Sequence, residues 1–419
     1  MFQFLCWRLI TGLPFADWSN DEFRILTYCL LIRSFFLALA LLQGGQLLLF
    51  HDFNFAIRSF GDIDKYFEIA KDTFSRLPYV VNPIEYPQAA TYLFLLISLI
   101  TGREKNTFAL MLNLVQFPIE LSTSLLIFRM GRDLIGRKRA FAGAIAYSLS
   151  PMVLYTWMSR YDCIPTFLTV LATYLLIRHE SLSAFLLLGG GAMFKWYPIV
   201  LLPIFGRFLH ENGRSRRSIG ILMVGAVALC ALYTLPFLAL DARAFFQGAY
   251  GYHLSRTQNF ESLPALLALI MYGNPMTRID LTVFWVLQFL GYSLVFLLPC
   301  RRNEDLVGCC AISLMNLVFF SKVFSPQFIT WFSPFLLIEV WDRRYWVYYW
   351  LLQASVYLEF PVFFHYHILR PRFGWTWLLG GLGFYTFVFI HLFSLGLLSI
   401  SLASQLRSGK SHYSSSSTM

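Results

Sequence analysis

Two aspartates, Asp62 and Asp64, stand two residues apart in the first polar loop of an otherwise apolar chain. The loop follows the first hydrophobic stretch, residues 33–50, so these carboxylates lie where the chain has just crossed a bilayer. Ionisable groups are costly there, and those that persist do chemistry or bind a ligand. Asp62 can act as a general base, and Asp64 can raise the pKa of Asp62 or bind substrate hydroxyls. The alternative is structural, because Asp is a favoured N-cap for a helix predicted over residues 63–74.

The same loop ends on a third acid, in the Glu-Tyr-Pro run at residues 85–87. Proline is expected in the first turn of a helix, and a helix is predicted to begin here. That leaves the glutamate unexplained, so we treat Glu85 and Tyr86 as candidate substrate contacts. A further acid, Asp162, begins a later apolar segment. It is either a second substrate contact or a structural residue, as an N-cap or as a partner for Arg160.

Four cations lie between or beside apolar segments further along the chain: Lys195, His253, Arg256 and Lys322. A charge in such a place is idle only if its side chain reaches the interface. Phosphate is the group that this set would hold, since Arg binds phosphate oxygens with two N–H groups and Lys acts as a point charge. His253 alone is equally consistent with a hydrogen-bonded structural histidine. No Cys or His spacing matches a metal site, so we predict neither a metal nor a cofactor.

The composition excludes an ordinary soluble globular protein. Of the 419 residues, 57% are hydrophobic and 18% aromatic, and only 13% are charged. Apolar runs of roughly 17 to 25 residues, each long enough to cross the hydrocarbon core as a helix, alternate with short basic connectors. The net charge of +10 is spread over those connectors, so it indicates orientation in a lipid bilayer and no nucleic-acid partner. The seven cysteines lie in apolar sequence and are interpreted as buried thiols.

Basic clusters set the expected orientation, because Lys and Arg are preferentially left on the cytoplasmic side during insertion. These clusters lie at residues 129–139, 207–217, 301–302 and 343–344. One topology keeps all four inside and places both termini in the cytoplasm. It has about twelve crossings, near residues 33–50, 107–129, 140–157, 162–178, 182–196, 197–207, 218–239, 280–300, 306–322, 325–341, 345–366 and 374–400. Two shorter apolar runs, 88–101 and 262–272, are predicted to lie along the outer surface as juxtamembrane helices.

The pair of segments 182–196 and 197–207 is unusual. Both are short, and Lys195 and Pro198 interrupt them. This predicts either a tilted hairpin or a helix that breaks where it lines a cavity. The three glycines at 189–191 are predicted to permit close helix packing.

The topology gives a single all-α membrane domain over residues 1–403, with a first extracytoplasmic loop over 51–106. The Ser-rich residues 404–419 cannot bury apolar area and are predicted to form a disordered cytoplasmic tail. With the basic loops inside, polar groups from distant loops gather on the opposite face. They form one candidate site, which a purely structural protein would not need: Asp62, Asp64, Glu85, Asp162, Lys195, His253, Arg256, Glu261, Lys322, Gln327, His365, His367 and Arg370.

Six motifs follow one another along this part of the chain. They are Gly61-Asp62-Ile63-Asp64-Lys65-Tyr66, Pro78-Tyr79 to Glu85-Tyr86-Pro87, Arg160-Tyr161-Asp162, Phe194-Lys195-Trp196-Tyr197-Pro198, Tyr252-His253-Leu254-Ser255-Arg256 with Glu261-Ser262, and Phe320-Ser321-Lys322-Val323-Phe324-Ser325-Pro326-Gln327. In this order they resemble the GT-C membrane glycosyltransferases. The resemblance runs from about residue 61 to 335. It extends to the polyprenyl-phosphate-mannose-dependent mannosyltransferases of the actinobacterial phosphatidylinositol-mannoside type and, more distantly, to the first mannosyltransferase of GPI-anchor synthesis.

The resemblance implies a mostly helical GT-C fold with a cavity open to the extracytoplasmic side. It implies transfer of a sugar, most similar to mannose transfer, from a polyprenyl-phosphate donor to a glycolipid or lipid-anchored glycan acceptor. Carried over onto this sequence, it makes Asp62 the base and Asp162 the acid of the second outer loop. The membrane would be the plasma (inner) membrane, or the endoplasmic reticulum membrane in a eukaryote.

The chemistry of such a transfer agrees with the residues. A lipid phosphate is a good leaving group, so one base and several cations suffice, and a single displacement inverts the anomeric centre. The remaining candidate substrate contacts are Asp64, Glu85, Tyr86, Lys195, His253, Arg256, Glu261, Lys322 and Gln327.

Two other classes remain open. A transporter or flippase of lipid-linked sugars would also place polar residues among spans, and such proteins often carry internal repeats and charges near the midplane. No clear repeat relates the two halves, and the charges gather on one face, which favours the enzyme. An accessory subunit of a glycosyltransferase complex would lack both the loop acids and the outer cations.

Overall fold

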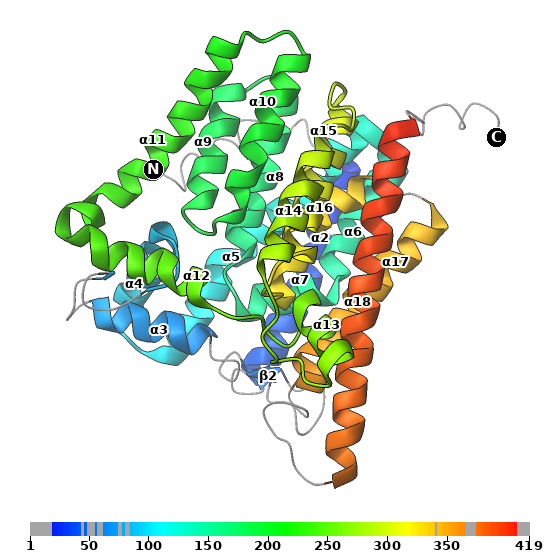
Figure 1. The fold of residues 1–419 in the computed structure, drawn as a ribbon. Coiled ribbons are helices and arrows are strands. Elements are labelled where there is room, and N and C mark those ends of the chain that lie inside the picture. Colours follow the sequence, from blue (N-terminus) through cyan, green and yellow to red (C-terminus); the bar gives the residue numbers. More distant parts are fainter. Residues whose placement is uncertain are drawn as a thin grey trace.

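The architecture is described from a computed structural model, over residues 19–42, 46–47, 55–56, 62–73, 78–79, 84–339, 342–364 and 374–408. Helices build the fold within these ranges (Figure 1), and the strands β1 (Gln46–Leu47) and β2 (Phe55–Ala56) pair antiparallel. The predicted all-α class is confirmed. The candidate residues His365, His367 and Arg370 lie outside the described residues.

The first half of the chain alternates long helices with short ones. Its elements are α2 (Asn20–Leu42), α3 (Asp62–Thr73), α4 (Gln88–Ile100), α5 (Lys105–Ile135), α6 (Arg137–Leu149), α7 (Pro151–Ser159), α8 (Cys163–Ile177), α9 (Ser181–Ala192), the 3₁₀ helix η2 (Tyr197–Leu201), α10 (Leu202–Glu211) and α11 (Arg216–Phe246). Both runs predicted as juxtamembrane helices are helical. Residues 88–101 correspond to α4, and residues 262–272 correspond to α13 (Leu263–Tyr272) in the second half.

The second half continues the all-helical pattern. Its elements are η3 (Gln247–Gly251), α12 (Tyr252–Ser255), α13 (Leu263–Tyr272), α14 (Thr282–Val295), α15 (Asn303–Phe319), η4 (Pro326–Phe328), α16 (Ile329–Glu339), α17 (Arg343–Tyr357), the π-helical η5 (Leu358–Phe363) and α18 (Gly374–Ser408). Within the described residues, three helices are long and apolar enough to cross a membrane, over Lys105–Ile135, Arg216–Ser255 and Gly381–Ser408. The number of crossings therefore stays a prediction.

Proline breaks two of the segments predicted as continuous or paired spans. The predicted span 140–157 is two helices, because α6 ends at Leu149 and Pro151 starts α7. In the second case α9 ends at Ala192, and η2 begins at Tyr197 with Pro198 in its first turn. The predicted break around Lys195 is thus confirmed, since proline fits a first turn and cannot continue a preceding helix.

The first predicted span was placed too late. It was expected over 33–50, whereas α2 runs from Asn20 to Leu42 and the strand β1 lies within the predicted span. The reason is Arg33, which looked like a helix end and instead lies buried in the middle of α2. Its guanidinium is 2.7 Å from the Glu120 carboxylate of α5, and both side chains are 1% exposed. A buried pair removes the cost that an isolated charge would impose there.

The tail was predicted to begin too early. α18 continues to Ser408, so the first five residues of the predicted tail, 404–408, are helical. The remainder, 409–419, lies outside the described residues.

The glycines of α9 pack as expected. A Cβ at Gly189 would lie 2.7 Å from the Ala226 carbonyl oxygen of α11, so glycine is needed for this approach. The predicted role of the glycines in close helix packing is confirmed, and the partner helix is α11.

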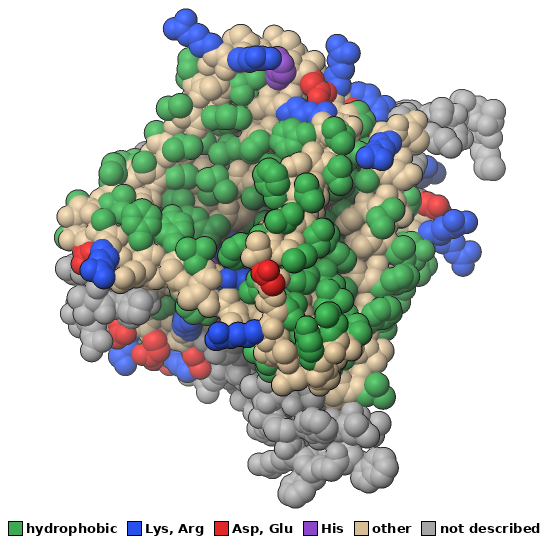
Figure 2. Space-filling model, in the orientation of Figure 1, with side chains coloured by type: hydrophobic (Ala, Val, Ile, Leu, Met, Phe, Trp, Pro, Cys, Tyr) green, Lys and Arg blue, Asp and Glu red, His purple; other side chains and the backbone are tan. Residues whose placement is uncertain are grey.

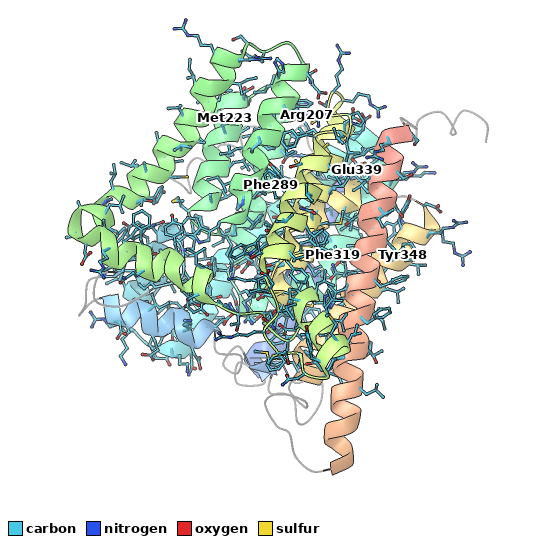
Figure 3. All side chains as sticks on the ribbon, in the orientation of Figure 1. Arg207, Met223, Phe289, Phe319, Glu339 and Tyr348 are labelled. Carbon is cyan, nitrogen blue, oxygen red and sulfur yellow. The ribbon has the colours of Figure 1, made fainter. Side chains whose placement is uncertain are left out.

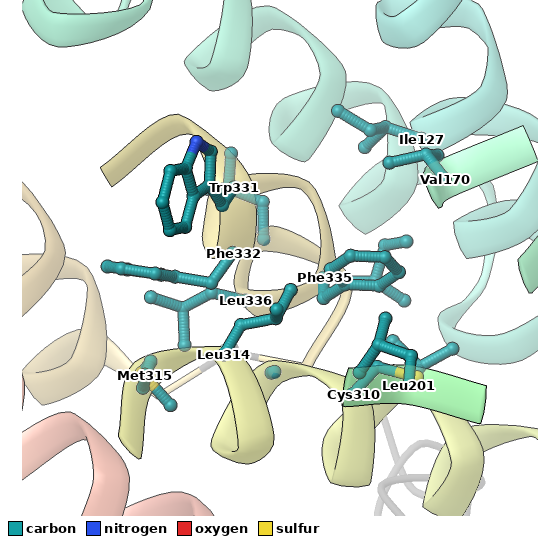
Figure 4. Close-up of a cluster of buried hydrophobic side chains, with 14 of the residues drawn as sticks. Ile127, Val170, Leu201, Cys310, Leu314, Met315, Trp331, Phe332, Phe335 and Leu336 are labelled. Carbon is teal, nitrogen blue, oxygen red and sulfur yellow. The ribbon is translucent and has the colours of Figure 1, made fainter. Parts of the chain in front are cut away.

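The core is built around α16, all of whose residues are buried. Figure 4 shows Trp331, Phe332, Phe335 and Leu336 of this helix between α15 on one side and α5 and α8 on the other. Because α16 begins directly after the Ser321–Gln327 region, its packing fixes one of the loops that carry candidate residues.

Polar groups gather at opposite ends of the helices. The connection between α10 and α11, the start of α15 and the end of α18 lie at one end, and α3, α12 and α13 lie at the other (Figure 1). Figure 2 shows Lys and Arg side chains around the first end and an apolar band between the ends. At the first end, labelled in Figure 3, Arg207 bonds to the Val295 carbonyl at 3.0 Å and so holds the end of α14.

Candidate active site

Asp62 is the first residue of α3 and faces a buried arginine. Its Oδ2 lies 2.7 Å from Nε of Arg160, whose side chain is 5% exposed against 32% for Asp62. Arg160 stands between α7 and α8, and its carbonyl accepts a hydrogen bond from Gln116 Nε2 of α5 at 2.8 Å. Burial disfavours the charge of Arg160, but the surrounding negative charges, Asp62 first, outweigh it and raise the pKa of Arg160. The pair is therefore an ion pair set at the rim of the protein interior.

Asp64 turns away from this pair. Its Oδ1 is 2.8 Å from Nζ of Lys105, at the start of α5. Residues two apart on a helix point in different directions, so Asp64 cannot lie beside Asp62 once both belong to the first turn of α3. The hypothesis that Asp64 sets the field around Asp62 is not supported by this arrangement.

Glu85 connects α3 to α12. Its carboxylate is 2.6 Å from Nζ of Lys65, and its carbonyl oxygen is 2.9 Å from His253 Nε2. The ammonium group of Lys65 also lies over the rings of Tyr86 and Tyr252, 5.8 and 5.7 Å from their centroids. Glu85 and His253 are thus brought together, and both hold the backbone of the site.

Tyr86 forms part of an aromatic wall. It packs edge to face on Tyr66 and on Tyr161, with centroids 5.3 and 5.9 Å apart, and Tyr66 stacks on Phe94 at 4.5 Å. The wall joins α3 and α4 to the loop that carries Arg160. Such packing fixes the position of Asp62 relative to that loop.

Asp162 is fully buried and satisfied by two donors. Lys195 Nζ lies 3.3 Å from Oδ2, and Trp331 Nε1 donates to Oδ1 at 2.9 Å. The residue occupies the N-cap position of α8 without a capping hydrogen bond from its side chain, and it does not pair with Arg160. The predicted N-cap position is therefore confirmed, whereas the predicted pairing with Arg160 is wrong, and the side chain of Asp162 joins three segments that are distant in sequence.

Two loops on the other side of the site are tied into one unit. Asn259 accepts from the Phe324 backbone N–H at 2.9 Å, and its own N–H donates to the Lys322 carbonyl at 3.2 Å. Lys322 Nζ donates to the Leu254 carbonyl at 3.0 Å. Lys322 and Arg256, which lie at this junction, have no ion-pair partner among the described residues.

The charges in these loops perturb one another. Burial, and then the positive charge of Arg256, lower the pKa of Lys322. Burial raises the pKa of Glu261 well above its usual value, and the negative charge of Glu359 adds to this. Gln327 is also buried, and its amide oxygen has no hydrogen-bond partner among the described residues.

The charged side chains of these loops and of Arg160 lie close enough to affect one another electrostatically. Glu261 interacts with both Arg160 and Arg256, and His253 interacts with Arg256 and Lys195. The predicted acids and cations that the structure describes therefore gather at one end of the molecule. Sequence reasoning gave no role to several of their neighbours. Lys65 lies within a quoted motif but was not singled out, and the others gave no motif signal: Lys105, Asn259, Trp331, Glu359 and His391.

An all-helical membrane domain with such a site is typical of a membrane-embedded transferase. The chain belongs to Glycosyltransferase family 87, whose model matches residues 85–326. The expected GT-C type of membrane glycosyltransferase is thereby confirmed, and a transporter is disfavoured. Asp62 precedes the matched segment.

The chain is also similar to GPI mannosyltransferase 1 of Saccharomyces cerevisiae, with 25% identity over 69% of this chain and 74% of that protein. Among solved structures, ArnT from Cupriavidus metallidurans bound to undecaprenyl phosphate has a TM-score of 0.47 at 14% identity, covering 82% of this chain and 72% of ArnT. The oligosaccharyltransferase of Archaeoglobus fulgidus has a TM-score of 0.46 at 12% identity, covering 92% of this chain and 56% of that chain.

The Asp162–Lys195 pair gives a first prediction. Lys195→Met leaves a buried carboxylate without its counter-charge, which typically costs about 3–5 kcal/mol. Adding Asp162→Asn removes that charge and keeps an acceptor for Trp331, so the double variant should be more stable than Lys195→Met alone. Thermal unfolding of the purified protein in detergent measures this order. A double variant that unfolds earlier than Lys195→Met would contradict the pairing.

Proposed function

We propose that this glycosyltransferase moves mannose from a polyprenyl-phosphate donor to a glycolipid or lipid-anchored glycan acceptor, with inversion at the anomeric carbon. The proposal rests on one observation. The partly exposed carboxylate of Asp62 lies at the same end of the molecule as Arg256 and Lys322, which have no ion-pair partner among the described residues. The similarity to GPI mannosyltransferase 1 supports mannose as the sugar. ArnT was solved with bound undecaprenyl phosphate, and that observation concerns ArnT. For the present chain the polyprenyl-phosphate donor is part of the proposal.

Asp62 is proposed as the general base. One of its oxygens is paired with Arg160, and no described residue donates a hydrogen bond to the other. A third of the side-chain surface of Asp62 is exposed, and with no partner among the described residues the second oxygen is proposed to accept the proton of an acceptor hydroxyl. Arg160 would then act as a positioning residue that holds the carboxylate in one orientation.

Arg256 and Lys322 are proposed to hold the phosphate of the donor, with His253 and Lys195 nearby. Two like charges close together are unfavourable until an anion lies between them. A lipid phosphate needs charge stabilisation as it leaves and needs no general acid. The adjoining side chains of Leu254 and Trp285 are exposed and apolar, which suits a substrate that remains partly in lipid.

We expect Asp62→Asn to abolish transfer, because the amide keeps the shape of the side chain but cannot take a proton, and loss of a general base typically costs about 10²–10⁴-fold. Donor binding should stay close to wild type, whereas stability should fall, because buried Arg160 loses its counter-charge, so turnover is compared on protein shown to be folded. Asp64→Asn is the matched control, two residues away and facing Lys105, and should retain activity. The assay follows labelled mannose from a polyprenyl-phosphate donor into glycolipid. Near-normal turnover by Asp62→Asn would rule out the assignment.

We expect Arg256→Ala to raise the KM for the donor strongly, because the phosphate would lose a guanidinium that can bind its oxygens with two N–H groups. The KM for the acceptor should not change. The cations are proposed to serve in place of a divalent metal, so transfer should persist in EDTA. Activity that disappears with EDTA and returns with added Mg²⁺ or Mn²⁺ would contradict that part of the proposal.

The site is proposed to face away from the cytoplasm, since the opposite end carries the basic connectors that insertion leaves inside. A soluble nucleotide sugar made in the cytoplasm could not reach such a site. A polyprenyl-phosphate sugar could, once it has crossed to the outer leaflet. The membrane would be the plasma membrane, or that of the endoplasmic reticulum in a eukaryotic cell.

Single cysteines in a cysteine-free background test this sidedness. A cysteine at Glu68, on the exposed face of α3, should react with an impermeant maleimide added to intact cells or sealed vesicles of known orientation. A cysteine at Ser215, in the basic connection before α11, should react only after the membrane is opened. The reverse pattern would remove the basis for a lipid-linked donor.

A further inference from the structure

A buried acid–histidine pair lies behind the cation loops and takes no part in the proposed chemistry. Nδ1 of His391, in α18, is hydrogen-bonded to the carboxylate of Glu359, in η5, and both side chains are fully buried. Replacing such a pair by apolar residues is often neutral or even stabilising. Ionisable residues inside a membrane domain are functional candidates by default. The pair therefore calls for a role other than stability.

Its contacts lead to the donor side of the site. The His391 ring stacks on Phe324, with centroids 4.3 Å apart and an interplanar angle of 19°. The Phe324 backbone is hydrogen-bonded in both directions to the Asn259 side chain. The backbone N–H of Asn259 in turn donates to the Lys322 carbonyl. The ring of His391 therefore supports the segment that carries Lys322.

Glu359 reaches the same unit by a second route. It lies within electrostatic range of Glu261, whose carboxylate accepts a hydrogen bond from Asn259 Nδ2 at 2.5 Å. Glu359 sits in a π-helical turn next to Phe360, whose backbone is non-helical, and irregular turns of this kind often occur at functional sites. The hydrogen bond to His391 fixes this irregular turn against α18.

We infer that Glu359 and His391 form a positioning pair, which holds the Asn259–Phe324 junction so that Lys322 and Arg256 meet the phosphate of the donor. The inference rests on the proposed function for the identity of the ligand, but not for the mechanical link. The pair acts through Phe324 and touches no substrate. Its loss should therefore affect the donor and leave the acceptor side, built on α3 and Asp62, unchanged.

The test compares two apolar replacements of buried pairs in the full-length protein. Glu359→Leu/His391→Leu removes the proposed positioning pair. Arg33→Met/Glu120→Leu removes the other fully buried pair, between α2 and α5, and serves as the matched control. Glu359→Gln is the conservative variant, because the amide oxygen can still accept from His391. Asn259→Ala removes the side-chain hydrogen bonds to the Phe324 backbone, and so breaks the proposed connection nearer to Lys322. It tests the inference if the Glu359→Leu/His391→Leu variant does not fold.

Donor and acceptor kinetics give the first readout, with polyprenyl-phosphate mannose as the probe. The Glu359/His391 double variant and Asn259→Ala should raise the KM for the donor by about tenfold or more, since small misplacements of binding groups can cost up to about 10²-fold. The KM for the acceptor should not change. The Arg33/Glu120 control and Glu359→Gln should keep the wild-type KM for the donor.

Hydrogen exchange followed by mass spectrometry gives a second readout that needs no activity. Peptides over residues 253–262 and 320–327 should exchange faster in the Glu359/His391 variant and in Asn259→Ala, and not in the control. If the wild-type protein transfers no mannose, the proposed function fails, and exchange alone still decides the positioning role. A wild-type donor KM with wild-type exchange, an equal rise in both KM values, or faster exchange of these peptides in the control would each overturn the inference.

Discussion

The site depends on one buried carboxylate that must be neutralised. Asp162 is fully buried, and an isolated charge there would be prohibitive. Its partners come from the turn after α9, which supplies Lys195, and from the core helix α16, which supplies Trp331. The three segments can fold only together, and their meeting point lies beside the Tyr161 ring, 4.8 Å from the Lys195 ammonium group. Arg160, two residues before Asp162, is thereby placed where it can face Asp62.

The two polar ends of the molecule use their charges differently. At the end with the basic connectors, acids neutralise several arginines: Glu22 pairs with Arg129 at 2.7 Å, and Asp21 pairs with Arg137. At the other end, Arg256 and Lys322 lie close to each other without a described acidic partner in contact. Folding has therefore left unneutralised positive charge where the loops meet, which suits an anionic ligand better than a structural role.

The sequence predicted the type and order of most elements, because apolar length and proline position are local properties. The break after α9 followed from Pro198, and the close approach of α9 to α11 followed from Gly189. The predicted helix boundaries were wrong where a charged side chain is buried against a partner that is distant in sequence. Arg33 was interpreted as the end of a span because Glu120, its partner, lies 87 residues away.

The candidate site was predicted as a set of residues and not as a set of pairs. Membrane topology places loops on one face, which is why acids and cations from distant loops could be grouped. It does not say which side chain meets which. The Asp62–Arg160 pair depends on α5, which holds the Arg160 loop through Gln116. Residues such as Trp331 and His391 belong to apolar helices, and their roles arise only from packing.

The pairing pattern separates the acids by the chemistry still open to them. Asp64 is paired with Lys105, Glu85 with Lys65, and Asp162 with both Lys195 and Trp331. Glu261 is buried and accepts a hydrogen bond from Asn259, so it is less accessible to an acceptor hydroxyl than Asp62 is. Asp62 differs from Asp64 and Glu85 in its partner: Arg160 is 5% exposed, whereas Lys105 and Lys65 are 39% and 43% exposed. A base must be both oriented and open to its substrate, and a buried arginine holds the partly exposed carboxylate of Asp62 in one orientation more firmly than an exposed lysine would.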